Sequence, residues 1–269
     1  MQIWLGFSAG TLRFSIFLGL FAVLIIAERM RPRRKNLFGR LIRWPTNLGV
    51  GASSLVIVKL IETLAPALAA IAAARFAETQ GFGILHWLAL DGIAGGAIAI
   101  IVLDFGIYLQ HVASHKVPVF WRMHRVHHAD RDFDVTTALR FHPFEIALST
   151  LYKIALVLAL GASPAAVLLF EILLNGLAMF NHANLALPLP LDRIVRALIV
   201  TPDMHRIHHS TIPREHNSNF GFNLSLWDRL FRTYRPEPEA GQLGMTIGLP
   251  DHQDEQPTGL RWSLLFPFK

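Results

Sequence analysis

The chain has 269 residues; 52% of them are hydrophobic, 16% are charged, and the formal net charge is +6. This composition, with a mean hydropathy of +0.40, argues against an ordinary soluble protein and indicates a chain partly solvated by lipid. The sequence contains no cysteine, which excludes disulfides, thiolate zinc sites and cysteine-ligated iron–sulfur clusters. Any metal ion must therefore be held by nitrogen and oxygen ligands.

Three apolar stretches in the first 110 residues are candidate membrane spans. Residues 12–27 approach the thickness of a bilayer, and positive charges follow this stretch instead of preceding it, unlike in a cleaved signal peptide. Residues 47–74 contain Lys59 and Glu62, which are one helical turn apart and are expected to pair or to face the bundle. Residues 84–110 form the third stretch and are rich in Gly and Ala, which suit close helix contact.

Two further apolar stretches, residues 146–160 and 164–180, are joined by a short turn and read as a helical hairpin. A strongly basic segment at residues 29–43 is more typical of a cytoplasmic membrane face than of a nucleic-acid site. This orientation places every histidine cluster on the cytoplasmic side. The sequence thus predicts an all-α integral membrane protein with four or five membrane-embedded helices and a cytoplasmic, histidine-rich helical cap. The alternative is a soluble protein with unusually apolar core helices.

Two segments lie outside these spans. Residues 183–200 open with a proline-broken loop and continue either as an amphipathic helix on the membrane surface or as a packed connector. Residues 236–269 form a polar tail, and the stretches RPEPEAGQLG, which begins at Arg235, and HQDEQPTG are loop-like. The tail is expected to carry no chemistry, and its His252 is expected to be non-functional.

Eight histidines fall into three short clusters. The hexapeptide MHRVHH at 123–128 returns 81 residues later as MHRIHH at 204–209, and a pair spaced i, i+4 precedes the first copy. Positions i, i+3 and i+4 of a helix share one stripe, so each triplet is expected to converge on one point. Neutral imidazole is the commonest metal ligand, whereas three imidazoles on one face fill a core poorly. The clusters therefore predict a metal centre built from His111, His115, His124, His127, His128, His205, His208 and His209.

Single polar residues near the clusters are candidates for additional roles. His182, at the end of the fifth stretch, would raise the set to nine imidazoles, enough for two metal ions with open positions. His142 is a second single histidine, in the stretch R-F-H-P-F-E at 140–145. A lone histidine at either position is also typical of a structural site. Asp203, Asp104 and Asn219 are expected to fix imidazole rings by hydrogen bonds, although Asp203 is equally suited to cap the helix of the second triplet.

Two metals in an all-nitrogen shell favour activation of oxygen over hydrolysis, because a hydrolytic site would show a nucleophile motif or a mixed carboxylate shell. Three other functions remain open. A metal transporter would place histidines in mid-membrane on broken helices. A bis-histidine haem protein needs only one axial histidine on each of two facing helices. A structural membrane protein leaves the repeated triplets unexplained.

Residues 100–235 carry an ordered set of motifs that resembles the fatty acid hydroxylase and sterol desaturase superfamily. The motifs are H-x-x-x-H at 111–115, H-x-x-H-H at 124–128 and 205–209, R-F-H-P-x-E at 140–145, N-H-A-N at 181–184, S-N-F-G at 218–221 and W-D-R-L-F at 227–231. The resemblance implies an integral-membrane, all-helical, oxygen-dependent dimetal oxygenase that hydroxylates or desaturates a C–H bond of a lipid.

In that resemblance the metal ligands are nine histidines, namely His111, His115, His124, His127, His128, His182, His205, His208 and His209. The ions would be iron, with zinc as the alternative. His142 also matches a motif position, as a ligand or as a residue that supports one. The implied division of the chain is residues 1–100 for the N-terminal spans and basic loop, 101–235 for the catalytic region and 236–269 for the tail.

The resemblance also has consequences for partners and location. The sequence has no His-Pro-Gly-Gly haem segment of a cytochrome b5 domain, so electrons are expected from a separate reductase, ferredoxin or cytochrome b5-like protein. Its short form is similar to bacterial members of the superfamily, which implies a bacterial inner membrane. Family membership does not fix the lipid or the choice between alcohol and alkene.

Overall fold

The protein is all-helical apart from a short N-terminal hairpin. A computed structural model describes residues 2–3, 7–65 and 69–269. Strands β1 (Gln2–Ile3) and β2 (Phe7–Ser8) pair antiparallel, and the other regular elements in these ranges are α- or 3-10 helices. The predicted all-α fold is therefore confirmed.

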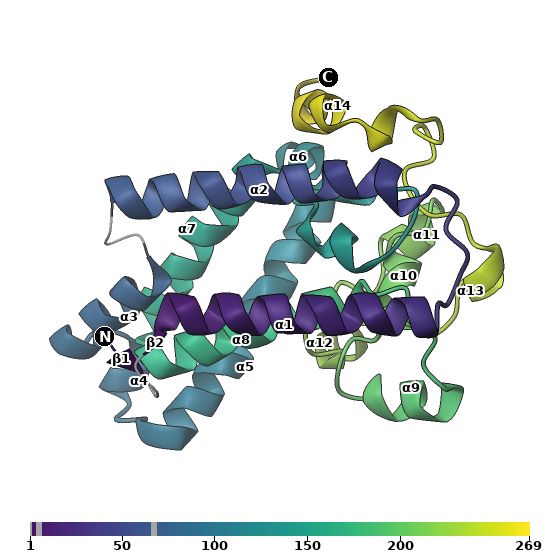
Figure 1. Ribbon diagram of the computed structural model, residues 1–269. Helices are drawn as coiled ribbons and strands as arrows, with labels where there is room; N and C mark the ends of the chain where they lie inside the picture. Colours follow the sequence, from purple (N-terminus) through teal and green to yellow (C-terminus); the bar gives the residue numbers. More distant parts are fainter. Residues whose placement is uncertain (1, 4–6, 66–68) are drawn as a thin grey trace.

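Five helices are long and apolar enough to cross a membrane, and they make the chain an integral membrane protein. Figure 1 shows α1 and α2 running across the view, one below the other, with the loop-rich end of the molecule at the right. The five helices are α1 (Ala9–Met30), α2 (Arg40–Leu64), α5 (Gly92–Lys116), α7 (Pro143–Leu160) and α8 (Pro164–Asn181).

The predicted hairpin of the fourth and fifth stretches is confirmed as α7 and α8, and its turn has local causes. Pro164 is the first residue of α8, where the backbone N–H of a helix has no acceptor within the helix. The Ser163 hydroxyl caps α8 by accepting a hydrogen bond from the Ala166 N–H. Gly161 ends α7 in the left-handed region, with φ +70°. A Cβ built on Gly83 would lie 2.2 Å from the Gly161 nitrogen, so only glycine permits this contact.

The second and third predicted stretches are each divided. In place of one helix over 47–74, α2 ends at Leu64 and α3 (Ala70–Gln80) follows separately; residues 66–68 lie outside the described ranges. The third stretch breaks after α4 (Ile84–Trp87), because the backbone turns left-handed before α5 begins. Helix α5 then runs past the predicted end at residue 110 to Lys116.

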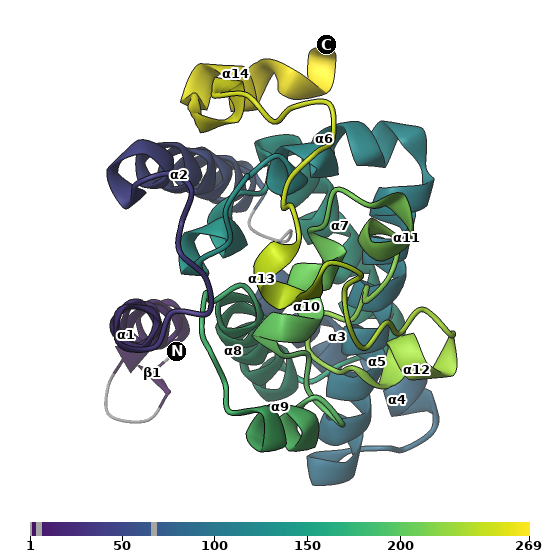
Figure 2. The same cartoon turned by 90° about the vertical axis from the view of Figure 1, so that its right-hand side faces the viewer.

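The long helices form two layers. Helix α1 packs on α8 and α2 packs on α7, while α5 contacts both α7 and α8. Figure 2 shows α1 and α2 stacked on the same side of the molecule with a clear separation between them. The largest apolar core lies where α3, α5, α7 and α8 meet, around Leu103, Val157 and Phe170. The predicted pairing of Lys59 with Glu62 is confirmed at 2.6 Å.

Short helices gather at one end of the bundle. They are α6 (Pro118–His128), η2 (Val135–Leu139), α9 (Leu189–Val195), α10 (Pro202–His208), α11 (Pro213–His216) and α12 (Leu226–Leu230). The basic segment folds over them, since Arg34 donates to the carbonyl of Met245 and its backbone N–H donates to Asn184. The basic segment and the histidines therefore share one end of the protein, as the charge pattern predicts.

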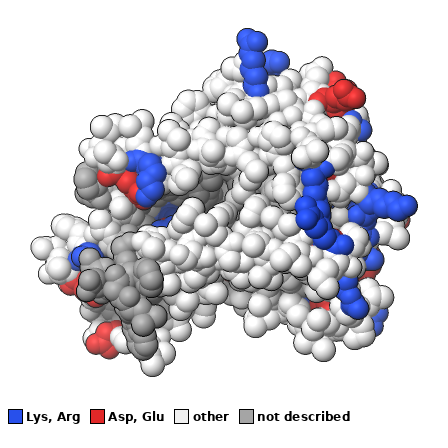
Figure 3. Space-filling view, viewed as in Figure 1, with Lys and Arg blue, Asp and Glu red and all other residues white. Residues whose placement is uncertain are grey.

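Charged side chains are unevenly distributed over the surface. On the face shown in Figure 3, the middle of the body is nearly uncharged, and Lys, Arg, Asp and Glu gather toward its ends. Helix α9, in the 183–200 connector, leaves Leu189, Leu191 and Ile194 exposed and buries Asp192. Its exposed apolar face fits the first of the two expectations for this segment, a helix on the membrane surface.

The C-terminal tail is packed and not loop-like, which corrects the sequence-based expectation. It contains α13 (Gly241–Gly244), η3 (Gln256–Thr258), α14 (Leu260–Leu265) and η4 (Phe266–Phe268). Buried Arg140 donates to the Pro257 carbonyl and to the Ser263 hydroxyl, and the Phe266 ring stacks on Trp262. These apolar and buried polar contacts outweigh the polar composition from which a loop was inferred.

Candidate metal centre

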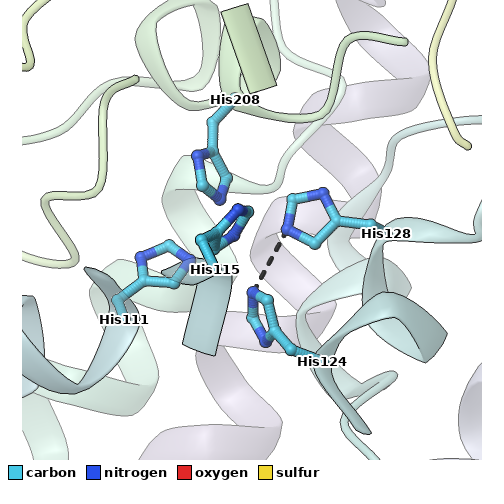
Figure 4. Close-up of side chains that lie close together, drawn as sticks. All are labelled: His111, His115, His124, His128 and His208. Carbon is cyan, nitrogen blue, oxygen red and sulfur yellow. Dashed lines mark hydrogen bonds between the residues drawn. The ribbon is translucent and has the colours of Figure 1, made fainter. Parts of the chain in front are cut away.

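Five buried or nearly buried histidines converge from three helices. Helix α5 supplies a pair one turn apart, α6 supplies a second pair and α10 supplies the fifth ring. Figure 4 shows the five rings turned toward a common centre. One ring nitrogen from each lies within 4.8 Å of those of the others, and the Nε2 atoms of His124 and His128 are 3.1 Å apart. This five-histidine group consists of His111, His115, His124, His128 and His208.

A second group of four fully buried histidines consists of His127, His182, His205 and His209, again with ligand atoms within 4.8 Å of one another. The Nε2 atom of His182 lies 3.1 Å from Nε2 of His127 and 3.1 Å from Nε2 of His205. Two imidazoles bound at about 2.1 Å to one ion would hold their nitrogens roughly 3 Å apart, so this spacing suits a metal.

Each histidine triplet is split between the two groups, which corrects the expectation that a triplet converges on one point. His124 and His128 join the five-histidine group while His127 turns to the other, and α10 divides its triplet in the same way. On a helix, i and i+4 are about 40° apart, whereas i+3 lies on the other side and about 100° from i+4. The groups are neighbours, with the His128 and His209 rings stacked at 4.4 Å.

Four imidazoles are fixed through Nδ1. His111 Nδ1 lies 2.7 Å from the Phe220 carbonyl oxygen, and His182 and His208 make the same 2.7 Å contact with carbonyl oxygens of Ala178 and Ser218. In each of these three rings an Nδ1–H can donate to the carbonyl, which leaves the Nε2 lone pair free to bind a metal. The fourth ring is that of His124, whose Nδ1 lies 2.6 Å from a Glu145 carboxylate oxygen.

The remaining ring nitrogens are typical of unfilled ligand positions. Nε2 of His111 and of His208, and both nitrogens of His115 and of His209, are buried without a hydrogen-bond partner among the described residues. Such groups are costly in a folded protein unless something binds them. Burial lowers the pKa of His208 and His209 well below the ordinary value, and neighbouring histidines lower it further. Neutral imidazoles with free lone pairs fit a nitrogen-ligated metal.

The single residues singled out in the sequence take other positions. His142 belongs to neither group; it caps α7 by accepting from the Phe144 N–H and lies 3.2 Å from the Leu264 carbonyl. Asp104 accepts from the Trp227 indole, and Asn219 donates to the Met204 carbonyl. The hydrogen bonds of these side chains reach backbone groups and an indole and no ligand imidazole, so they hold the surrounding loops and helices.

Asp203 is the second residue of α10 and not its N-cap, so the predicted capping role is wrong. Its carboxylate accepts from Arg33 at 3.0 Å and from Arg206 at 2.5 Å. The N-cap position belongs to Thr201. Asp203 therefore ties the basic segment to the base of α10, and its effect on the histidines is indirect.

Two residues beside the groups are not among the sequence-based candidates. Glu145 contacts His124, and the signal was present in the R-F-H-P-x-E motif. His216, on α11, has its ring centroid 4.5 Å from that of His128 and 4.8 Å from that of His115. Burial and the nearby His124 lower the pKa of His216 to about 4. His216 stands alone between Glu215 and Asn217, and this setting gave no sequence signal.

Comparisons with known proteins agree with this arrangement. The ornithine lipid hydroxylase OlsE of Rhizobium tropici is 33% identical over 156 residues, covering 55% of this chain and 45% of that protein. The human alkylglycerol monooxygenase is 32% identical over 149 residues, covering 55% of this chain and 32% of that protein. Cholesterol 25-hydroxylase of Rattus norvegicus is 26% identical over 148 residues, covering 54% and 48%.

The chain spans less than half the length of these relatives. No solved structure matches it. A family model described as fatty acid hydroxylase matches residues 96–233, which is more than half of the 269 residues and includes all nine histidines of the two groups. The chain belongs to the fatty acid hydroxylase family.

Proposed function

We propose that the protein is a membrane-bound, oxygen-dependent dimetal oxygenase that hydroxylates or desaturates a C–H bond of a lipid. The observation that carries this proposal is the pair of adjacent, buried histidine groups at one end of an apolar helical bundle. The named relatives include hydroxylases and monooxygenases, which supports oxidative chemistry.

The nine histidines of the two groups would hold the ions, five around one and four around the other. Iron is the proposed metal and zinc the alternative, because imidazole suits both. Two such ions, when bound, would supply the activation of dioxygen on which oxidation of an unactivated C–H bond depends. The catalytic region is residues 101–235, with residues 1–100 as the N-terminal spans and 236–269 as the tail.

The protein's own groups prepare this site in two ways. Glu145 and three backbone carbonyls fix ring tautomers and directions before any ligand binds, so little reorganisation is required. Complete burial of His205, His208 and His209 excludes water from the centre. Exclusion of water limits side reactions of a strongly oxidising site.

Partners follow from the same chemistry. The reaction needs a lipid substrate, dioxygen and a separate electron donor, which we propose is a reductase, a ferredoxin or a cytochrome b5-like protein. The basic segment at the histidine end supports an orientation with the centre on the cytoplasmic side of a bacterial inner membrane. No nucleic-acid partner is proposed.

The test compares lipid extracts from cells with and without the protein, grown with and without oxygen. An oxygenase produces an oxidised lipid that depends on both the protein and oxygen. The matched controls are His208→Ala, which removes a proposed ligand, and His252→Ala, which removes a histidine in the tail. Identical extracts under all conditions, with metal accumulating in the cells instead, would favour a metal transporter.

A further inference from the structure

Three charged residues meet inside the membrane-spanning bundle, away from the histidines. Lys153 of α7 lies 2.5 Å from one carboxylate oxygen of Glu171 on α8, and Arg13 of α1 lies 2.5 Å from the other. The side chain of Glu171 is 4% exposed and that of Lys153 is 16% exposed. Charged groups in membrane-spanning helices are costly and mark binding sites or transport paths more often than helix contacts.

This charged cluster is too far from the histidines to touch the metal ions. Lys153 is eight residues beyond Glu145, which contacts His124, and this separation is about 12 Å along α7. Glu171 precedes His182 by eleven residues, or about 16 Å along α8. The cluster therefore stands roughly half of a bilayer core away from the metal centre.

The cluster lies beside the separation between α1 and α2. Helix α1 packs on α8 and α2 packs on α7, whereas α1 and α2 approach each other at one end, where Glu28 lies 3.7 Å from Arg40. Figure 3 shows a hollow between these two helices, walled mostly by uncharged side chains, with a basic side chain visible inside it. The charged cluster thus joins α1, α7 and α8 beside this hollow.

An apolar path leads from the cluster toward the histidine end. On α1, Arg13 is followed by Phe17, Phe21 and Leu24 at the spacing of one helix face. These three side chains pack with Met179 of α8 and with Val135 and Ala138 of η2, the segment that follows the first histidine triplet. The charged cluster and the metal centre are therefore the two ends of one apolar surface.

The charges of the cluster do not balance. Two cations, Arg13 and Lys153, face one carboxylate, Glu171, so the three groups carry a net charge of +1. An excess charge in a low-dielectric environment is unfavourable unless an ion of opposite sign joins it. Guanidinium and ammonium groups suit phosphate and carboxylate.

We propose that Arg13 and Lys153 of this cluster bind the anionic headgroup, a phosphate or carboxylate, of the lipid substrate. The lipid enters between α1 and α2 and lays its hydrocarbon chain along the apolar path toward the histidines. This inference rests on the proposed function and deepens it, because it assigns an anionic substrate class. It also places the oxidised C–H bond away from the headgroup, by roughly half the thickness of a bilayer core.

The test measures headgroup preference on the full-length protein in detergent, independently of turnover. Native mass spectrometry compares retention of phosphatidylglycerol with that of phosphatidylcholine carrying the same acyl chains. Wild type is expected to retain phosphatidylglycerol preferentially. Arg13→Gln and Lys153→Gln should each reduce that preference roughly tenfold, the effect of losing one charge-assisted contact. The matched control Arg261→Gln removes an exposed cation from α14 and should leave the preference unchanged.

Glu171→Gln separates a binding site from a purely structural ion cluster. Removing this carboxylate raises the net charge of the cluster, so a binding site is expected to retain phosphatidylglycerol more strongly than wild type. If the cluster is purely structural, wild type shows no headgroup preference. Arg13→Gln, Lys153→Gln and Glu171→Gln then lose thermal stability without any change of preference. That result overturns the inference. Wild type that contains no metal but still prefers phosphatidylglycerol would refute the proposed oxygenase function and leave the headgroup site standing.

Discussion

Glu145→Gln tests whether a carboxylate strengthens metal binding through His124. The Glu145 oxygen lies 2.6 Å from His124 Nδ1, and both side chains are largely shielded from solvent, with exposures of 11% and 2%. A carboxylate behind a ligand imidazole fixes its tautomer and increases its basicity. Glutamine keeps the size and an oxygen acceptor but removes the charge.

The expected loss of metal affinity is about 10- to 100-fold, which corresponds to about 1.4 to 2.8 kcal/mol. Metal content is measured by elemental analysis after dialysis against a graded series of chelator concentrations, and thermal unfolding reports on folding. The matched control Glu78→Gln removes an exposed carboxylate on α3 and should keep wild-type affinity. Wild-type affinity in Glu145→Gln would refute the role assigned to this contact.

Three further outcomes are expected. His208→Ala should lose metal and turnover while the protein still inserts, and full activity in this variant would count against the ligand assignment. His252→Ala should keep metal and turnover. It should lose about 1 kcal/mol of stability, because the His252 ring packs edge-on against Phe266. Asp203→Asn should destabilise the fold by about 3 to 5 kcal/mol, since it breaks a buried ion pair, and an unchanged melting temperature would contradict this. Burial lowers the pKa of His182 from 6.5 to about 4, so the unfolded state binds more protons in this range. Metal-free protein should therefore lose stability as the pH falls from 6.5 toward 4, and melting temperatures that rise over this range would show the opposite sign.

Helix content and the identity of the clustered histidines could be predicted from sequence because both depend on local patterns. Apolar runs flanked by charges located all five long helices. The two hexapeptides lie at α6 and α10 and carry six of the nine histidines. The helical repeat also kept i, i+4 pairs such as His111 and His115 together. These features require no knowledge of tertiary contacts.

The partition of each triplet and the roles of the supporting residues could not be predicted in this way. His127 faces a different group from His124 because α8 and α10 present their own histidines on that side, which is a tertiary fact. Asp203 pairs with Arg33 across 170 residues of sequence, so its local position suggested a cap instead. The packed tail was missed for the same reason, since its contacts with α2 and α6 are long-range.

The metal-to-protein ratio of the purified protein, recorded together with its optical spectrum, tests the central claim most directly. We predict two metal ions per chain and no Soret band. We also predict that His208→Ala, in the five-histidine group, and His205→Ala, in the four-histidine group, each lower the ratio toward one. A wild-type protein that remains metal-free after reconstitution with iron or zinc, or one that binds haem, would contradict the account.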